Sequence, residues 1–172
     1  MERMAGLMSS RIFSAILPVF IGILFVVIGN FPVGGLLPSP LFVLMPLYFW
    51  GMVRPDLMTP FWVFVLGVLE DLLSGGPPGV WALSFLGVYF MIERQRDVLA
   101  GLSGIGALMG FAAAALIACG SAYVIVTIYY WHLQPIAPTL AVLAMTVIVY
   151  IPMVFVLGLI HRRLVGALRS DI

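Results

Sequence analysis

Long apolar runs alternate with short charged clusters along the whole chain. A helix needs about 20 apolar residues to cross a bilayer, and most of the runs approach that length. Glycine, proline and polar residues divide the two longest uncharged stretches, as is typical of turns. The pattern predicts an all-α fold, a polytopic membrane bundle of six transmembrane helices in a single domain, 1–172. The expected spans are 11–30, 37–53, 57–73, 78–92, 99–130 and 137–160.

Three of the expected spans, the second to the fourth, are shorter than the bilayer core requires. Longer neighbours or interfacial turns are expected to cover them. Pro46 and Pro152 fall inside spans and are expected to kink their helices. The first apolar run is longer than the core of a signal peptide, which favours a retained span.

The basic residues predict the orientation of the bundle. All eight are arginine, and they fall before the first span, in alternate connections and after the last span. An even number of spans therefore places them all on one side, which the positive-inside rule assigns to the cytoplasm together with both termini. The arginines expected to anchor this topology are Arg54, Arg94, Arg96, Arg162 and Arg163.

Composition narrows the classes of function. The 172 residues are 63% hydrophobic and 9% charged, whereas a soluble domain carries roughly 25% charged residues. A net charge of +1 offers no basic face for nucleic acid. Cys119 is the single cysteine and is expected to be a packing residue. No nucleophile with a base, metal-ligand spacing or phosphate loop is evident, so we expect no catalytic residue, cofactor or metal.

An acidic pair, Glu70 and Asp71, stands out because it lies near the end of an apolar run. An acid costs a few kcal/mol at such a depth and opposes the negative end of its helix dipole. The favoured interpretation is structural: Asp71 or Ser74 accepts the free amides at the start of the next helix across the turn at Gly75 and Gly79. A contact with a partner's donor or cation, and an ion or proton relay, remain alternatives.

A row of small side chains marks the fifth span. Small residues allow close helix packing in lipid, either within this chain, which is the favoured interpretation, or against a partner. The expected packing face comprises Ser103, Gly106, Ala107, Gly110 and Ala114.

Three motifs in the middle third of the chain resemble a known family. They are Leu-Tyr-Phe-Trp at 47–50, Arg-Pro at 54–55, and Gly-x-x-x-Asp-Leu-Leu-Ser-Gly-x-x-x-Gly at 67–79, followed by Ala-Leu at 82–83. Together with the size and the six expected spans, they resemble MreD, the rod shape-determining membrane protein of bacteria. Glu70 has no assigned place in the family pattern, and the Pro-Pro pair at 77–78 makes this turn stiffer than the pattern requires.

The resemblance implies a non-enzymatic scaffold of the cell-elongation machinery in the bacterial inner membrane, supporting rod shape and peptidoglycan synthesis. The implied partner is a bitopic MreC-like protein. Through it the chain would meet a RodA-like glycosyltransferase, a class B penicillin-binding transpeptidase and an MreB-like filament. The resemblance also implies a fold similar to the S-component of energy-coupling-factor transporters. That similarity is one of fold and carries no transport function by itself. The alternative function is the substrate-binding subunit of a small-molecule, vitamin-type membrane transporter.

Overall fold

The computed structural model describes residues 2–31, 39–100 and 105–165, and within these ranges the chain forms six α-helices and no strand. The predicted all-α class is confirmed. The helices are α1 (Glu2–Asn30), α2 (Leu44–Val53), α3 (Pro60–Ser74), α4 (Val80–Ala100), α5 (Ile105–Tyr130) and α6 (Ile136–Ile160). A short π-helix, His161–Val165, continues α6.

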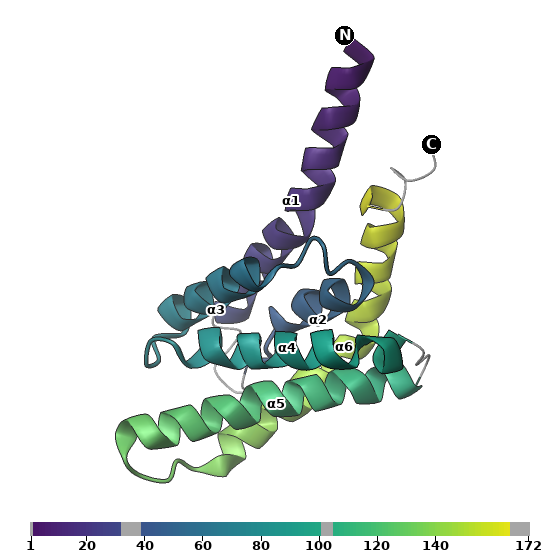
Figure 1. Cartoon of the computed structure of the whole chain (residues 1–172). Helices are drawn as coiled ribbons and strands as arrows, with labels where there is room; N and C mark the ends of the chain where they lie inside the picture. The colour runs from purple at the N-terminus through teal and green to yellow at the C-terminus, as the bar shows by residue number, and fades with distance from the viewer. Residues whose placement is uncertain (1, 32–38, 101–104, 166–172) are drawn as a thin grey trace.

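The helices form a bundle in which α2 is the central member (Figure 1). The short α2 packs against α1, α4, α5 and α6, while α3 and α4, α4 and α5, and α5 and α6 pair as neighbours. Leu44, Met45, Leu47 and Trp50 of α2 are fully buried. A helix of this length can lie inside the bundle because its longer neighbours cover it on all sides.

The ends of the helices alternate between two sides of the bundle. Figure 1 shows the α3–α4 turn and the α5–α6 turn at the left-hand side, and the end of α4 with the start of α5 at the right. The Phe49 and His161 rings lie 6.0 Å apart, which brings α2 close to the end of α6. Consecutive helices from α3 to α6 therefore run in opposite directions between these two sides.

Two helices are longer than the sequence predicted. α1 begins at Glu2 rather than at residue 11, and α4 continues to Ala100 rather than ending at residue 92. The predicted limits followed the charged clusters. Charge does not interrupt backbone hydrogen bonds, and segment 93–97 contains no glycine or proline that would end a helix.

Several predicted helix starts are too early. The predicted fifth span, 99–130, is one of them, because residues 99 and 100 belong to α4. α2 begins at Leu44, because residues 39–43 are not helical, and α3 begins at Pro60. Pro60 occupies the first position of α3, where its missing N–H costs nothing. α4 begins at Val80, so the predicted start at Pro78 is wrong, and Pro78 belongs to the turn.

The predicted kink at Pro46 is also wrong, because Pro46 lies in the first turn of α2. The amides of a first turn have no partner within the helix, so proline removes no helical hydrogen bond there. Pro152, by contrast, lies inside α6 as predicted.

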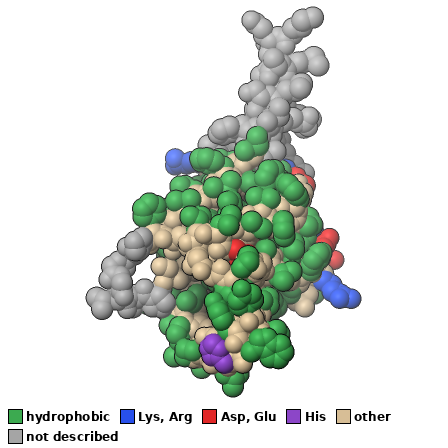
Figure 2. All heavy atoms as spheres, turned by 90° about the vertical axis from the view of Figure 1, so that its left-hand side faces the viewer, with side chains coloured by type: hydrophobic (Ala, Val, Ile, Leu, Met, Phe, Trp, Pro, Cys, Tyr) green, Lys and Arg blue, Asp and Glu red, His purple; other side chains and the backbone are tan. Residues whose placement is uncertain are grey.

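The outward surface of the bundle is largely apolar, and Figure 2 shows apolar side chains over most of one face. α1, α3, α4, α5 and α6 each expose large apolar side chains, for example Phe20, Phe61, Leu83, Leu116 and Phe155. Two helices of the described residues, Ile105–Tyr130 and Ile136–Arg163, are long and apolar enough to cross a membrane by length and composition, and Ile16–Asn30 and Leu44–Val53 are shorter apolar helices. A helix that is apolar on every side is either fully buried or in contact with lipid.

Candidate functional site

The carboxylate of Asp71 connects the end of α3 to the start of α4. Its oxygens accept hydrogen bonds from the backbone N–H groups of Gly79 (2.9 Å), Trp81 (2.8 Å) and Ala82 (3.2 Å). The amides at the start of a helix have no partner within it, and here one side chain supplies the acceptors. We call these four residues the Asp71 lock. The negative carboxylate faces the positive end of α4, which offsets its unfavourable position in the last turn of α3.

The turn between the two helices depends on two glycines. Gly75 (φ 69°) follows the last residue of α3 and Gly79 (φ 92°) precedes α4, both in the left-handed region that glycine adopts most easily. Ser74 does not accept an amide of α4. Its hydroxyl donates to the carbonyl of Asp71 at 3.4 Å, so the capping acceptor is the carboxylate alone.

α3 and α4 approach each other closely at Gly67, one turn before Asp71. A Cβ on Gly67 would overlap the Ala82 Cα and would lie 2.8 Å from the Ala82 nitrogen and 3.0 Å from the Trp81 carbonyl oxygen. Ala82 is also a member of the Asp71 lock. The glycine therefore sets the distance between the backbones that the lock joins.

Glu70 contacts a different helix from its neighbour. Its Oε1 accepts a hydrogen bond from Nδ2 of Asn30 at 3.2 Å, and the same Nδ2 donates to the Val26 carbonyl at 2.9 Å. The Glu70 side chain is buried, with 9% of the residue exposed. The acidic pair thus divides its contacts: Glu70 joins α3 to the end of α1, and Asp71 joins α3 to α4.

The Asn30–Glu70 contact can be tested with a double-mutant cycle. Glu70→Ala removes the acceptor of the Asn30 amide, and Asn30→Ala leaves a buried carboxyl without its donor, so each change should lower the free energy of unfolding by about 1–3 kcal/mol. The double variant should lose less than the sum of the two single losses. Thermal unfolding in detergent measures the stability of the wild type, the two single variants and the double variant. Strictly additive losses of stability would show that the contact does not form.

The small residues of α5 are distributed over its buried and half-buried sides. Gly110 and Ala114 are buried and Gly106 and Ala107 are half-buried, while Ser103 lies outside the described residues. α5 packs against α4 and α6, so the described members of the face have neighbours within the chain. Packing inside the chain and contact with a partner both remain proposals for this face.

The arginines named as topology anchors are distributed over three helix ends. Arg54 pairs with Asp56 in the α2–α3 turn, with 2.7 Å between Nη2 and Oδ2. The hydrogen bond from Arg54 lowers the pKa of the exposed Asp56 carboxyl. Arg94, Arg162 and Arg163 are exposed, and Arg96 is half-buried.

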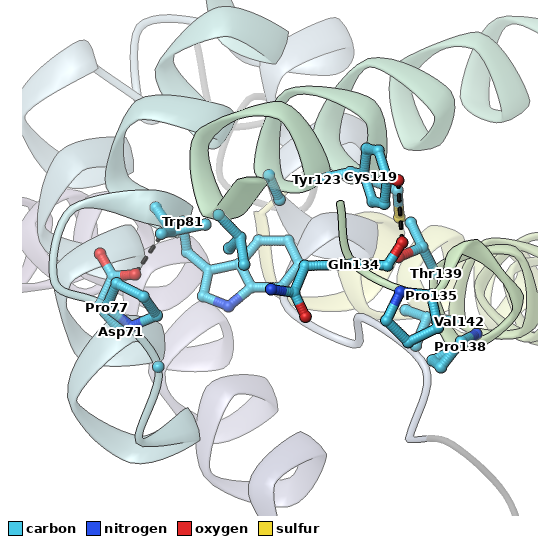
Figure 3. A pocket seen from close by; sticks show the side chains of 14 residues that line it. Asp71, Pro77, Trp81, Cys119, Tyr123, Gln134, Pro135, Pro138, Thr139 and Val142 are labelled. Carbon is cyan, nitrogen blue, oxygen red and sulfur yellow. Dashed lines mark hydrogen bonds between the residues drawn. The ribbon is translucent and has the colours of Figure 1, made fainter. Parts of the chain in front are cut away.

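A cavity of about 320 Å³ lies beside the Asp71 lock. It is lined by the α3–α4 turn, the first turn of α4, the second half of α5, the α5–α6 turn and the start of α6. Figure 3 shows Trp81 and Gln134 between the Asp71 side of the cavity and a second group formed by Cys119, Thr139 and Val142. The Tyr123 hydroxyl donates to the Gln134 carbonyl at 3.0 Å and thereby fixes the α5–α6 turn against α5.

Several residues of this region were not identified from the sequence as site residues. Asn30 ends the first apolar run, and an amide at that position is a signal for a polar contact between helices. Trp81 and Gln134 carry no comparable signal, because the cavity forms from two turns about 55 residues apart in the chain. Only the folded bundle brings those turns together.

Comparison with known proteins assigns the chain to a family. The family model described as rod shape-determining protein MreD matches residues 8–164, which is nearly the whole chain. No curated protein and no solved structure matches the chain, so the expected similarity to transporter S-components stays a prediction. On the extent of this match, the chain belongs to the MreD family of rod shape-determining membrane proteins.

Proposed function

We propose that this protein is a non-enzymatic scaffold of the bacterial cell-elongation machinery that crosses the inner membrane six times and binds a bitopic MreC-like partner. The observation that carries the proposal is the match to the MreD family across residues 8–164. The family is one of shape-determining structural proteins and is functionally linked to the MreC and MreB complex. Contact with a RodA-like glycosyltransferase and a class B penicillin-binding transpeptidase would follow through the MreC-like partner.

The surface of the bundle supports this proposal. Exposed apolar side chains on α1, α3, α4, α5 and α6 need lipid or another apolar surface around them. Short turns join α3 to α4 and α5 to α6, so recognition would use helix faces or turns. The outward faces are therefore available to a single transmembrane helix of a bitopic protein, which would pack against them as helices do in lipid.

The orientation of the bundle can be tested by single-cysteine labelling. Asp56→Cys and Leu133→Cys, made in a Cys119→Ala background, place a thiol in the α2–α3 turn and in the α5–α6 turn, at side chains that are 58% and 81% exposed. We expect a membrane-impermeant maleimide to label the cysteine at 133 in intact spheroplasts, and the cysteine at 56 only after the membrane is opened. The reverse pattern would contradict cytoplasmic termini.

The scaffold function can be tested by co-purification. The tagged full-length chain, expressed with an MreC-like protein in the same cell, should co-elute with it in detergent. An unrelated bitopic protein of similar length, expressed in the same way, should not. Recovery of a monodisperse chain without the partner, under conditions where both proteins are abundant, would contradict the proposal.

The transporter alternative requires a cavity with several free polar groups. Two hydroxyls that could have served are already bonded: Ser84 donates to the Val80 carbonyl, and Thr146 donates to the Val142 carbonyl while it accepts the Leu41 N–H. Both hydroxyls therefore bond to a carbonyl of their own helix, and Thr146 also joins α6 to the segment before α2. The scaffold remains the better-supported function.

A further inference from the structure

The cavity beside the Asp71 lock has a mainly apolar wall. Its apolar members include Pro77, Val80, Trp81, Ala122, Val126 and Val142. Tryptophan and proline side chains have few conformations to lose, so the wall is preformed rather than adaptable. Neither the lock nor the proposed contact with a partner requires this space.

Three polar side chains on the wall, those of Asp71, Tyr123 and Gln134, are already engaged by the chain itself. The Asp71 carboxylate accepts three backbone N–H groups, and the Tyr123 hydroxyl donates to the Gln134 carbonyl. The Gln134 amide lies 2.9 Å from the His132 ring. A polar solute would therefore find few free partners, and water is poorly held by an apolar wall with so few polar groups.

The dimensions of the cavity match a hydrocarbon chain. Along α5 it extends from Cys119 to Val126, which is about 10 Å at 1.5 Å per residue. A methylene group occupies about the volume of a liquid water molecule, about 30 Å³, so a volume of about 320 Å³ holds on the order of ten methylenes. A transmembrane helix, about 10–12 Å across with its side chains, is too thick for this space.

The two ends of the cavity lie at different depths in the bundle. Gly76, Gln134 and Pro135 border it at the turns, and Cys119 and Val142 border it deeper within the helices. This is the order in which a lipid presents its groups, with the headgroup at the interface and the chain inside. We propose that the cavity binds one acyl chain of a membrane lipid, from the leaflet that contains the α3–α4 and α5–α6 turns.

A photoreactive lipid can test the proposal. The full-length chain is reconstituted into phospholipid vesicles that contain a phosphatidylglycerol with a diazirine in the middle of one acyl chain, and the labelled residues are identified by mass spectrometry after illumination. Ala122 is 6% exposed and lines the cavity, whereas Val124 is 54% exposed and does not. We expect more label on Ala122 and Val126 than on Val124.

A matched pair of substitutions sharpens the test. Val126→Trp fills the cavity, and Val124→Trp adds the same bulk to the outward face of the same helix. We expect Val126→Trp to reduce the cavity label by about tenfold, equivalent to about 1.4 kcal/mol of binding, and Val124→Trp to leave it unchanged. Cys119, the single cysteine, provides a second readout, because lipid added to the detergent-solubilised wild type should slow its alkylation by N-ethylmaleimide.

Two outcomes would overturn the proposal. If the amount of label followed exposure, with more label on Val124 than on Ala122, the lipid would be making only ordinary contact with the outer surface of the bundle. Equal label on Ala122 in the wild type and in Val126→Trp would mean that the lipid reaches α5 without entering the cavity. The proposal rests on the membrane embedding proposed above but not on the partner. The labelling uses the isolated chain, so its result is valid even if co-purification fails.

Discussion

Gly67→Ala is expected to force α3 and α4 apart and to destabilise the chain strongly, although the substitution adds only one methyl group. The added Cβ would overlap the Ala82 backbone, and backbone cannot rotate away as a flexible side chain can. Separating the helices would also pull the Ala82 N–H from the Asp71 carboxylate, now 3.2 Å away. We expect the free energy of unfolding to fall by about 3 kcal/mol or more, which is the upper end of the usual cost of overpacking.

Thermal unfolding and yield in detergent measure this effect. For a chain of this length, a loss of about 3 kcal/mol lowers the melting temperature by roughly 6–12 °C. Gly87→Ala is the matched control, because Gly87 is an exposed glycine of α4 with nothing within 4 Å of its added Cβ. That variant should melt at the wild-type temperature or slightly above it, since alanine favours the helix.

Comparing the two alanine variants shows whether the loss of stability comes from the close contact at Gly67 or from replacing any helical glycine. Equal melting temperatures for Gly67→Ala and Gly87→Ala would show that α3 and α4 do not approach as closely as described. A partial rescue of Gly67→Ala by Ala82→Gly is not expected, because the contact is with the Ala82 backbone rather than its methyl group.

Hydropathy predicted the helical class because lipid leaves few alternatives to a helix for an apolar segment. It also located the acidic pair, since charge inside an apolar run is rare. The same signal was a poor guide to where helices end. α4 continues through Glu93 and Arg94 because charged residues mark the edge of an apolar layer rather than the end of backbone hydrogen bonding.

Contacts between remote segments were beyond the reach of the sequence pattern. The family motif begins at Gly67, but nothing in the sequence shows that this glycine faces Ala82 while Gly87 and Gly120 face open space. The partner of Glu70 is Asn30, 40 positions away on α1. The cavity likewise depends on which turns meet at one side of the bundle. The local hydrophobic pattern of a single sequence does not show which turns are neighbours in space.

Asp71→Ala is the second large effect that we expect. The substitution removes the acceptor for three backbone N–H groups, those of Gly79, Trp81 and Ala82. Loss of a helix N-cap costs about 0.5–2 kcal/mol, and a buried donor left unpaired costs about 1–3 kcal/mol. Because the Ala82 bond is buried while the other two are partly accessible, we expect a total loss of about 2–4 kcal/mol.

Asp71→Asn and Asp56→Ala define what the carboxylate contributes. Asparagine keeps one acceptor oxygen but has no charge to interact with the positive end of α4. The free energy of unfolding of Asp71→Asn should therefore lie between those of the wild type and Asp71→Ala. Asp56→Ala removes an exposed acid that pairs with Arg54 and should cost no more than about 1 kcal/mol.

Partner binding distinguishes a structural lock from a recognition site. If Asp71 serves only to join α3 to α4, Asp71→Asn should lower the melting temperature while the fraction that remains folded still binds an MreC-like partner in a pull-down. Wild-type melting with lost binding would instead assign the carboxylate to the interface. The first result is expected, because both carboxylate oxygens already accept backbone amides of the same chain and Asp71 is only 5% exposed.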